Sequence, residues 1–234
     1  MGRIARCVIP GLWHHVTQRG NLQQVVFFDD RCRRVYLELL RRHCHLNQVG
    51  ITGYCLMGNH VHVLAIPDRP DGLARAFGRA HNDYARWLNL GRRETGHLWQ
   101  NRFYSCVLDE PHRWEALRYV ELNPVRAGLV HRPEHWPWSS ARAHLGGDET
   151  GLVDIREWRQ RWSPLTWNEA LDHGIGEASL LDRIRQATRT GRPAGGEDFV
   201  RQVEAISGRV LRPQRRGPKP HQCAAEAQPN FEVM

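Results

Sequence analysis

The sequence predicts an α+β fold in which helices pack on an antiparallel sheet. Segments with the alternation of a strand and segments with the apolar spacing of a helix follow one another along residues 1–145. A Gly-Asn pair between two β-type segments predicts a hairpin turn. The resulting order, βαββαβ and then a further helix, is that of a ferredoxin-like sandwich.

The first strand and the first helix are predicted near the start of the chain. The segment "LWHHVTQRG" (residues 12–20) alternates as a strand does. The segment "DDRCRRVYLELLRRHCHLNQVG" then places apolar residues such as Cys32 and Val35 at helical spacing. Either Asp29 or Asp30 can cap this helix.

A hairpin is predicted where "ITGYCLM" and "HVHVLAIP" flank Gly58 and Asn59, because both residues of that pair tolerate positive φ. His60 and His62 therefore open the second strand of the hairpin. Since they are two residues apart, they point to one face of the sheet, while Val61 points to the other.

A second helix is predicted in "DGLARAFGRAHNDYARWLNL", where Leu73, Phe77 and Tyr84 share one face. The ordinary interpretation of the opposite, basic face is contact with solvent, and contact with phosphate groups is the alternative. This basic face carries Arg75, Arg79 and Arg86.

The last predicted strand, "NRFYSCVLD", precedes the helix "EPHRWEALRYVELNPVRAG", which is expected to stop at Pro124. At about 100° per residue, Tyr119 lies roughly 160° from Leu117 and is predicted to face away from the apolar side. Glu115 and Asn123, one turn before and after Tyr119, could add an oxygen ligand. The alternative is a tyrosine that only extends toward solvent.

The composition changes after about residue 145. Gly, Trp, Pro and Arg become frequent, and two shorter helical patterns appear. The segment from residue 209 is basic and proline-rich, with little to bury, which predicts a flexible arm. We therefore divide the chain into a domain at 1–145, a helical extension at 146–208 and a basic tail at 209–234.

The charge balance favours an anionic partner. Lys and Arg number 33 against 25 Asp and Glu, a net charge of +8, and Lys219 is the only lysine. Six cysteines form no CxxC pair, which predicts free thiols in a reducing cytoplasm. No apolar run approaches the roughly 18 residues of a membrane helix, so no membrane partner is expected.

The spacing of the histidines leaves two interpretations open. On a strand, the imidazoles of His60 and His62 can converge on one metal ion, but two buried core histidines would have the same pattern. His43 and His45 have the same spacing within a helix, where they point about 200° apart and cannot share a metal ion in the same way. Spacing alone therefore does not decide the role of His60 and His62.

Two motifs indicate a role for His60 and His62 through their resemblance to a known family. "MGNHVHVL" and the later "RYVELNPVRAGLV" resemble the single-tyrosine transposases of the HUH nuclease superfamily, and the REP-associated tyrosine transposases most closely. The segments "HVTQRGN", "WQNRFYS", "WPWSS" and "TGRPAGGEDFV" extend the resemblance, in the same order, to about residue 213.

The resemblance implies roles for four residues. His60 and His62 match the metal ligands of these enzymes, Tyr119 matches the nucleophile, and Asn123 occupies the position of a third polar ligand. Gly58 stands where relatives often have proline, and both residues suit a turn. The implied metal is Mg²⁺ or Mn²⁺, because the reaction takes place on a phosphate.

The implied activity is metal-dependent cleavage and rejoining of single-stranded hairpin DNA, such as palindromic repeats, through a 5′-phosphotyrosine intermediate. We expect a nucleoid-associated cytoplasmic protein, and a monomer more than a homodimer. A hairpin-binding protein without activity and a hydrolytic metallonuclease are the alternatives. Basic and polar residues are the candidates for contact with DNA: Arg19, Asn21, Arg75, Arg79, Arg86, Arg212, Arg215 and Arg216.

Overall fold

The computed structural model describes residues 5–147, 151–173 and 178–212. The basic arm predicted from residue 209 therefore lies outside the described residues from residue 213 onward. Arg215 and Arg216, two of the candidates for contact with DNA, are in that part of the chain.

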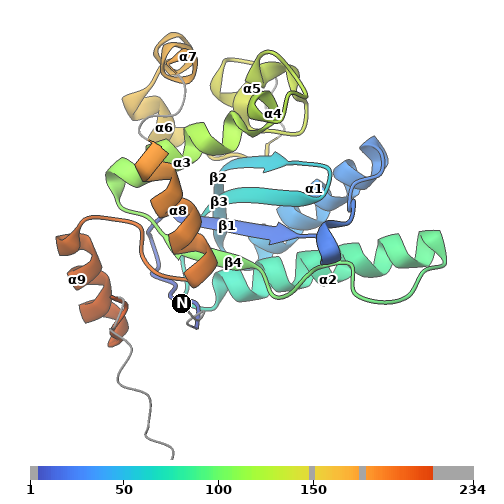
Figure 1. Cartoon of the computed structure of the whole chain (residues 1–234), viewed down its shortest axis with the longest axis horizontal. Coiled ribbons are helices and arrows are strands. Elements are labelled where there is room, and N and C mark those ends of the chain that lie inside the picture. The colour runs from blue at the N-terminus through green and yellow to red at the C-terminus, as the bar shows by residue number, and fades with distance from the viewer. Residues whose placement is uncertain (1–4, 148–150, 174–177, 213–234) are drawn as a thin grey trace, which may run out of the picture.

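Four strands form one antiparallel sheet (Figure 1). The predicted α+β class and the βαββαβ order are confirmed. The strands have the spatial order β2-β3-β1-β4, which places the N-terminal strand in the middle of the sheet. The elements are β1 (His14–Arg19), α1 (Asp30–Leu46), β2 (Val49–Leu56), β3 (His60–Pro67), α2 (Gly72–Arg92) and β4 (Tyr104–Val107).

The predicted hairpin between β2 and β3 is confirmed, but its turn differs from the expected one. The N–H of Met57 donates to the carbonyl of His60 at 2.9 Å, so Gly58 and Asn59 are the two turn residues. Neither residue has the positive φ that we expected. The Gly58 carbonyl instead accepts the N–H of Val26 at 2.9 Å, so the segment after β1 supports the turn.

Aspartate caps fix where two helices begin. Asp29 accepts a hydrogen bond from the backbone N–H three residues on at 2.7 Å, so Asp29, and not Asp30, caps α1. Asp109 accepts the equivalent bond at 3.0 Å and caps α3 (Glu110–Glu121). The start of α3 matters because this helix carries the predicted nucleophile.

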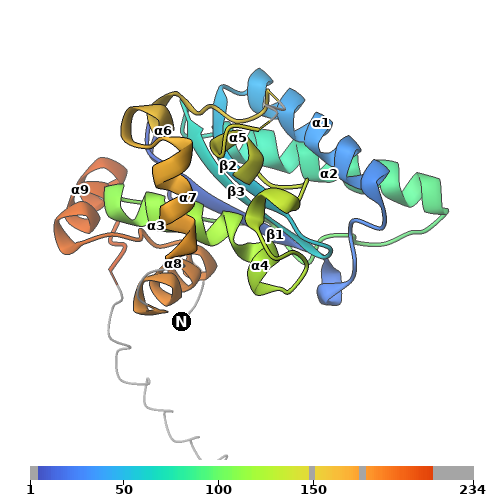
Figure 2. The same ribbon diagram turned by 90° about the horizontal axis from the view of Figure 1, so that it is seen from above.

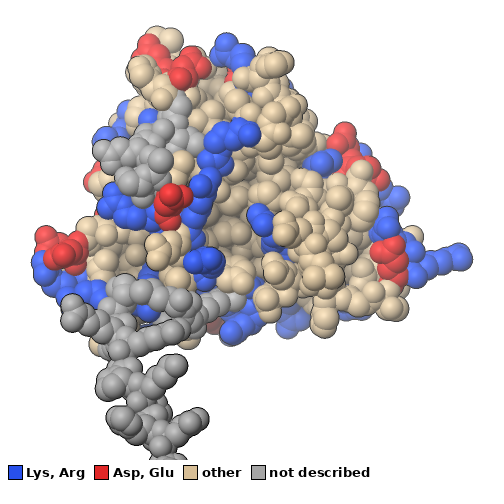
Figure 3. Space-filling view, in the orientation of Figure 1, with Lys and Arg blue, Asp and Glu red and all other residues tan. Residues whose placement is uncertain are grey.

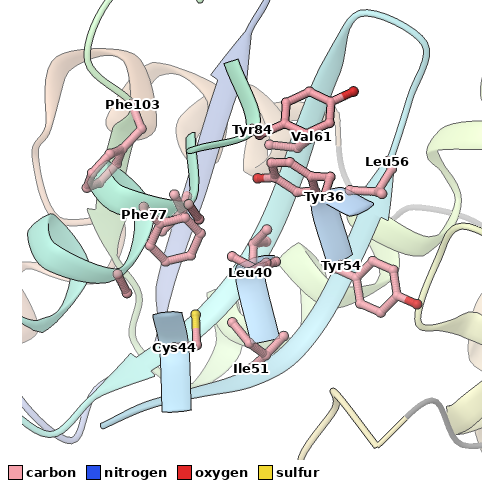
Figure 4. Packing of buried hydrophobic residues seen from close by; sticks show 14 of the residues in the cluster. Tyr36, Leu40, Cys44, Ile51, Tyr54, Leu56, Val61, Phe77, Tyr84 and Phe103 are labelled. Atoms are coloured by element: carbon pink, nitrogen blue, oxygen red, sulfur yellow. The ribbon is translucent and has the colours of Figure 1, made fainter. Parts of the chain in front are cut away.

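One face of the sheet is covered by α1 and α2, which lie side by side (Figure 2). The strand residues on this face, among them Val61 and Val63, enter a core that is rich in aromatic side chains. Tyr36, Phe77 and Tyr84 are completely buried there (Figure 4). The alternation predicted for β3 is confirmed, because Val61 faces this core and not the side of the histidines.

The other face is covered by α3 and α8 (Ala178–Thr190) (Figures 1 and 2). Leu64 of β3 packs there with Leu117, Trp167 and Ile184 in a second core. Residues on both sides of the boundary predicted at 145 therefore share one core. The remaining helices are η1 (Asn21–Gln23), α4 (Asn123–Arg126), η2 (Pro133–His135), α5 (Ala141–His144), α6 (Arg156–Arg161), α7 (Pro164–Asp172) and α9 (Glu197–Ser207).

The cysteines within the described residues are buried free thiols. Burial raises the pKa of Cys44 and of Cys106 to about 12, so both stay protonated at neutral pH. Among the described helices, none combines the length and the apolar character that crossing a membrane requires.

Candidate active site

The sheet face under α3 and α8 carries a row of histidines. In the pairing of β1 with β3, Thr17 lies opposite His62 and Arg19 lies opposite His60. Because alternate residues of a strand point to the same side, His15 shares this face with His60 and His62. The two predicted metal ligands are therefore neighbours on β3 and lie beside a third histidine from β1.

His60 is half-buried, and the hairpin turn fixes its ring. Nδ1 of His60 lies 2.6 Å from Oδ1 of Asn59. The amide nitrogen of Asn59 donates to the carbonyl of Gln23 at 3.0 Å, which keeps the amide oxygen on the side of His60. Nδ1 of His60 therefore donates, and Nε2 carries the lone pair that can bind a metal ion.

His62 is buried, with 6% of its surface exposed, and its Nδ1 lies 2.9 Å from Nε2 of His15. The ring centroids of His60 and His62 are 5.0 Å apart. Burial, and then the charge of Arg19, lowers the pKa of His60 to about 4. Burial, followed by the neighbouring histidines, lowers the pKa of His62 well below its ordinary value. Both rings are neutral at neutral pH, which is the form that binds metal.

Tyr119 lies against these histidines, but it does not face outward from its helix as we predicted. It is buried, with 6% of its surface exposed, and its ring centroid is 5.3 Å from that of His62. The helix α3 is packed against the sheet on one side and against α8 on another. Leu117 and Tyr119 are therefore both buried, although they lie on different sides of α3.

Two guanidinium groups flank the ring of Tyr119. The Cζ atom of Arg126 is 4.2 Å from the ring centroid, and that of Arg185 in α8 is 5.2 Å from it. A side-chain hydrogen bond with Tyr119 raises the pKa of Arg185. Positive charge thus lies where a phosphate group or an oxyanion at this tyrosine would be placed.

A buried carboxylate holds the C-terminal end of α3. Glu121 is completely buried and accepts hydrogen bonds from the Ser140 hydroxyl at 2.6 Å, Nδ1 of His144 at 2.5 Å and the Trp167 indole at 2.9 Å. These partners belong to the segment around α5 and to α7. The orientation of Tyr119, two residues before Glu121, therefore depends on segments that follow α3 in the chain.

Glu115 and Asn123, predicted as possible oxygen ligands beside Tyr119, have other partners. Oδ1 of Asn123 accepts a hydrogen bond from Arg126 at 2.6 Å. Glu115 forms an ion pair with Arg118 on the same helix. Asn123 lies one turn beyond Tyr119, as predicted, but in this structure its amide oxygen is bonded to Arg126.

The donors of His60 and His62 fit a divalent cation. Each ring commits Nδ1 to a neighbour, so the two Nε2 atoms are the nitrogens left to bind. Within the described residues, no group of three or more His, Cys, Asp or Glu side chains is placed to hold a metal ion. Further ligands could come from an amide oxygen, such as that of Asn123, from oxygen atoms of a phosphate and from water.

The predicted DNA-contacting residues do not form one cluster. Arg19 lies beside His60 in the sheet. Asn21 and Arg86 line a cleft of about 780 Å³ between α2 and residues 96–103. Figure 3 shows basic side chains bordering a hollow on the face where α8 covers the sheet.

Among the described residues, the other candidates are Arg75, Arg79 and Arg212. Arg75 and Arg79 are exposed on α2, whose buried side belongs to the core on the opposite face of the sheet. Arg75 pairs with Asp71 at 2.7 Å. Arg212 pairs with Glu204 of α9 at 2.8 Å.

Sequence reasoning missed His15, Arg126 and Arg185 as parts of the site. His15 was within reach, because it precedes Arg19 by four residues on a predicted strand and so shares its face. Arg126 stands in the same motif as Tyr119, one turn after Leu122. Arg185 has no such local signal, since only the packing of α8 on α3 brings it to Tyr119.

Comparisons with known proteins show which proteins this chain resembles. Residues 9–123 match the family described as transposase IS200 like. A Haemophilus influenzae protein named as a REP-associated tyrosine transposase is 31% identical over 98 residues, which cover 37% of this chain and 55% of that protein. The chain thus spans about half the length of this curated relative.

One solved structure, a REP-associated tyrosine transposase bound to a REP hairpin, aligns with a TM-score of 0.55. The alignment covers 66% of this chain and 90% of that chain, at 16% sequence identity. At this identity the similarity concerns the fold alone.

Proposed function

We propose that this chain, whose residues 9–123 match the family described as transposase IS200 like, cleaves and rejoins single-stranded hairpin DNA through a covalent bond to Tyr119. The observation that carries this proposal is the contact of Tyr119 with His62, at 5.3 Å between ring centroids, beside two imidazoles whose Nε2 atoms remain for a metal ion. A nucleophile next to a metal-binding pair is the arrangement that phosphoryl transfer requires.

We assign His60 and His62 as ligands of Mg²⁺ or Mn²⁺, and Asn123 as the third. When bound, the cation would polarise the non-bridging oxygens of the scissile phosphate. Imidazole nitrogen suits manganese, and phosphate oxygen suits both metals. The low pKa of His60, about 4, keeps this ligand unprotonated across the physiological range.

The proposed step exchanges one phosphate ester for another. The Tyr119 hydroxyl oxygen bonds to phosphorus while the bond from phosphorus to the 3′ oxygen breaks. The phenolic proton passes to solvent, and the departing 3′ oxygen takes up a proton from solvent and becomes a hydroxyl. In the reverse direction a 3′-hydroxyl attacks the phosphotyrosine and restores the phenol, so rejoining requires no nucleotide triphosphate.

Arg126 and Arg185 are in position to stabilise this reaction. Both guanidinium groups lie within 5.2 Å of the Tyr119 ring centroid. Positive charge beside the attacking oxygen favours the ionised phenol over the neutral one. It also offsets the negative charge that gathers on the phosphate in the transition state.

We propose hairpin-bearing single strands as the DNA class, with a monomer as the active unit. The REP-associated relative of known structure is bound to a REP hairpin. In this chain, basic side chains border the hollow beside α8 (Figure 3), which suits a folded strand with a high density of phosphates. Unpaired bases next to a hairpin can stack on aromatic and arginine side chains.

An adduct assay tests the proposal. An end-labelled oligonucleotide that contains a hairpin from a repeat near the gene is incubated with the protein and Mg²⁺ or Mn²⁺. We expect a labelled band that survives denaturing electrophoresis and is absent after Tyr119→Phe, His60→Ala or His62→Ala. Tyr84→Phe is the matched control, since Tyr84 lies in the core on the other face of the sheet.

The outcome separates the alternatives. Cleavage without an adduct, by a Tyr119→Phe variant that stays active, would indicate a hydrolytic nuclease. Hairpin binding without cleavage, over several repeats and both metals, would indicate a DNA-binding protein without activity.

A further inference from the structure

We propose that Thr188 of α8 and His15 of β1 are positioning residues that fix the tautomer of His62 and so direct its Nε2 lone pair toward the metal site. The inference rests on the proposed function for its metal, but it concerns the protein's own hydrogen bonds. Thr188 lies outside the residues that match the transposase family.

A chain of three hydrogen bonds carries the inference. The Thr188 hydroxyl is 2.8 Å from the carbonyl oxygen of Ile184 and 2.8 Å from Nδ1 of His15. Nε2 of His15 is in turn 2.9 Å from Nδ1 of His62. The side chains are all buried, with 3% of Thr188, 1% of His15 and 6% of His62 exposed. Water therefore does not compete for most of these hydrogen bonds.

The donor and the acceptor of each of these bonds follow from the group at the end of the series, the carbonyl of Ile184. The carbonyl of Ile184 can only accept, so the Thr188 hydroxyl donates its proton there. The Thr188 oxygen is then an acceptor for His15, and Nδ1 of His15 carries the proton. A neutral imidazole has one N–H, so Nε2 of His15 has no proton and accepts a hydrogen bond from the N–H at Nδ1 of His62. Nε2 of His62 is left with the lone pair.

The surroundings of Thr188 agree with this direction. The Cys106 sulfur lies 3.1 Å from the Thr188 oxygen. Burial keeps this thiol protonated, so it can donate to the second lone pair of the Thr188 oxygen. The His15 and His62 rings are nearly parallel, with 3° between their planes, and the 5.1 Å between their centroids fits an edge-to-edge hydrogen bond with 2.9 Å between the nitrogens.

The same pattern appears at His60 with a simpler partner. There the amide oxygen of Asn59 accepts the hydrogen bond from Nδ1 directly, and the tautomer is fixed within the hairpin turn. At His62 the corresponding support comes from another strand and from α8. Outer partners of this kind orient metal-bound histidines and raise their basicity.

A comparison of three variants tests the inference. Thr188→Val keeps the shape but removes the hydroxyl, and Thr188→Ser restores the hydroxyl. Thr190→Val is the matched control, because the buried Thr190 hydroxyl bonds to Gln186 within α8 in the same way. The first readout is the tautomer of His62 in metal-free protein, from two-bond ¹H–¹⁵N correlations with His62→Gln for assignment. The second is the Kd for Mn²⁺, from titration followed by electron paramagnetic resonance.

We expect the wild-type protein to carry the proton on Nδ1 of His62. Thr188→Val should mix the two tautomers and weaken Mn²⁺ binding about 10-fold, in the range found for outer partners of metal ligands. Thr188→Ser and Thr190→Val should stay within about twofold of the wild type. Wild-type His62 protonated on Nε2 would overturn the inference, even if the valine variant failed to fold. The inference would also be overturned if Thr188→Val kept the same His62 tautomer and the same Mn²⁺ affinity as the wild-type protein.

These results are separate from those of the adduct assay. A wild-type protein that forms the Tyr119 adduct while Thr188→Val behaves as wild type would contradict only the role of Thr188 and His15. A protein that forms no adduct but carries the proton on Nδ1 of His62, lost in Thr188→Val, would contradict the proposed function and leave the hydrogen-bond chain in place.

Discussion

The indole N–H of Trp167 donates a hydrogen bond to Oε2 of Glu121 at 2.9 Å, and both side chains are completely buried. This bond connects α7 to the last residue of the helix that carries Tyr119. A buried carboxyl group without hydrogen-bond donors is costly in such an environment, so the partners of Glu121 stabilise the fold as well as the position of α3.

Trp167→Phe should therefore lower the free energy of unfolding by about 1–3 kcal/mol more than Trp158→Phe. The two replacements remove the same atoms from the same core, but the indole nitrogen of Trp158 is buried and has no hydrogen-bond partner among the described residues. Urea titration of both variants measures the difference. Equal losses would mean that the bond to Glu121 adds no net stability.

Arg185→Gln should slow formation of the Tyr119 adduct about 10-fold, because it removes a charge beside the nucleophile. Arg183→Gln, on the same helix, makes the same change of charge away from Tyr119 and should leave the rate near that of the wild type. Single-turnover rates at saturating hairpin separate this effect from weaker binding. If both variants lose activity equally, the overall charge of α8 matters and the contact with Tyr119 does not.

Gly53→Ala should destabilise the protein by about 1–3 kcal/mol, as overpacked cores do. A Cβ at Gly53 would lie 2.4 Å from Cδ1 of Leu117 on α3, and this leucine is completely buried. Gly50→Ala, on the same strand, is the control, since its Cβ would meet only Ile66, at 3.8 Å. Thermal unfolding of the two variants measures the contrast, and addition of Leu117→Val should recover part of the loss in Gly53→Ala.

Stability should fall as the pH drops from about 6.5 toward 4. Burial lowers the pKa of His14 and His15 to about 4 and that of His81 to about 3. In this pH range the unfolded chain binds protons that the folded protein does not, so acid favours unfolding. Each such histidine adds a slope of up to about 1.4 kcal/mol per pH unit.

His81→Gln should reduce this slope by the contribution of about one proton, whatever the effect of the substitution on stability at neutral pH. His131→Gln, at an exposed position, is the control. Urea titrations at several pH values between 4 and 7 provide the measurement. An unchanged slope in His81→Gln would mean that His81 titrates alike in the folded and unfolded chain.

The order of strands and helices along the chain, and the face of β3 that His60 and His62 share, could be predicted from the sequence because they depend on local patterns. Alternation placed Val61 on one face of β3 and His60 and His62 on the other, and the structure has the same arrangement. The Gly58-Asn59 turn was found in the right place, but its φ angles were not, because contacts from Val26 support the turn.

Tyr119 shows where local patterns stop being sufficient. Helical spacing identifies one apolar side of α3, but this helix is enclosed on more than one side. The second covering element is α8, whose Arg185 follows Tyr119 by 66 residues. The same holds for Thr188, which meets a histidine 173 positions away. Side chains brought together by packing over such separations leave no periodic signal.

The 173-residue separation between His15 and Thr188 also has a consequence for the protein during its own synthesis. A ribosome completes the sheet, His60, His62 and Tyr119 long before it completes α8. Until then the nascent chain has Tyr119 and the two histidines of β3, but Arg185 is not yet beside the tyrosine and Thr188 is not yet beside His15. The candidate site is therefore assembled last, and a chain that ends before α8 lacks these two contacts.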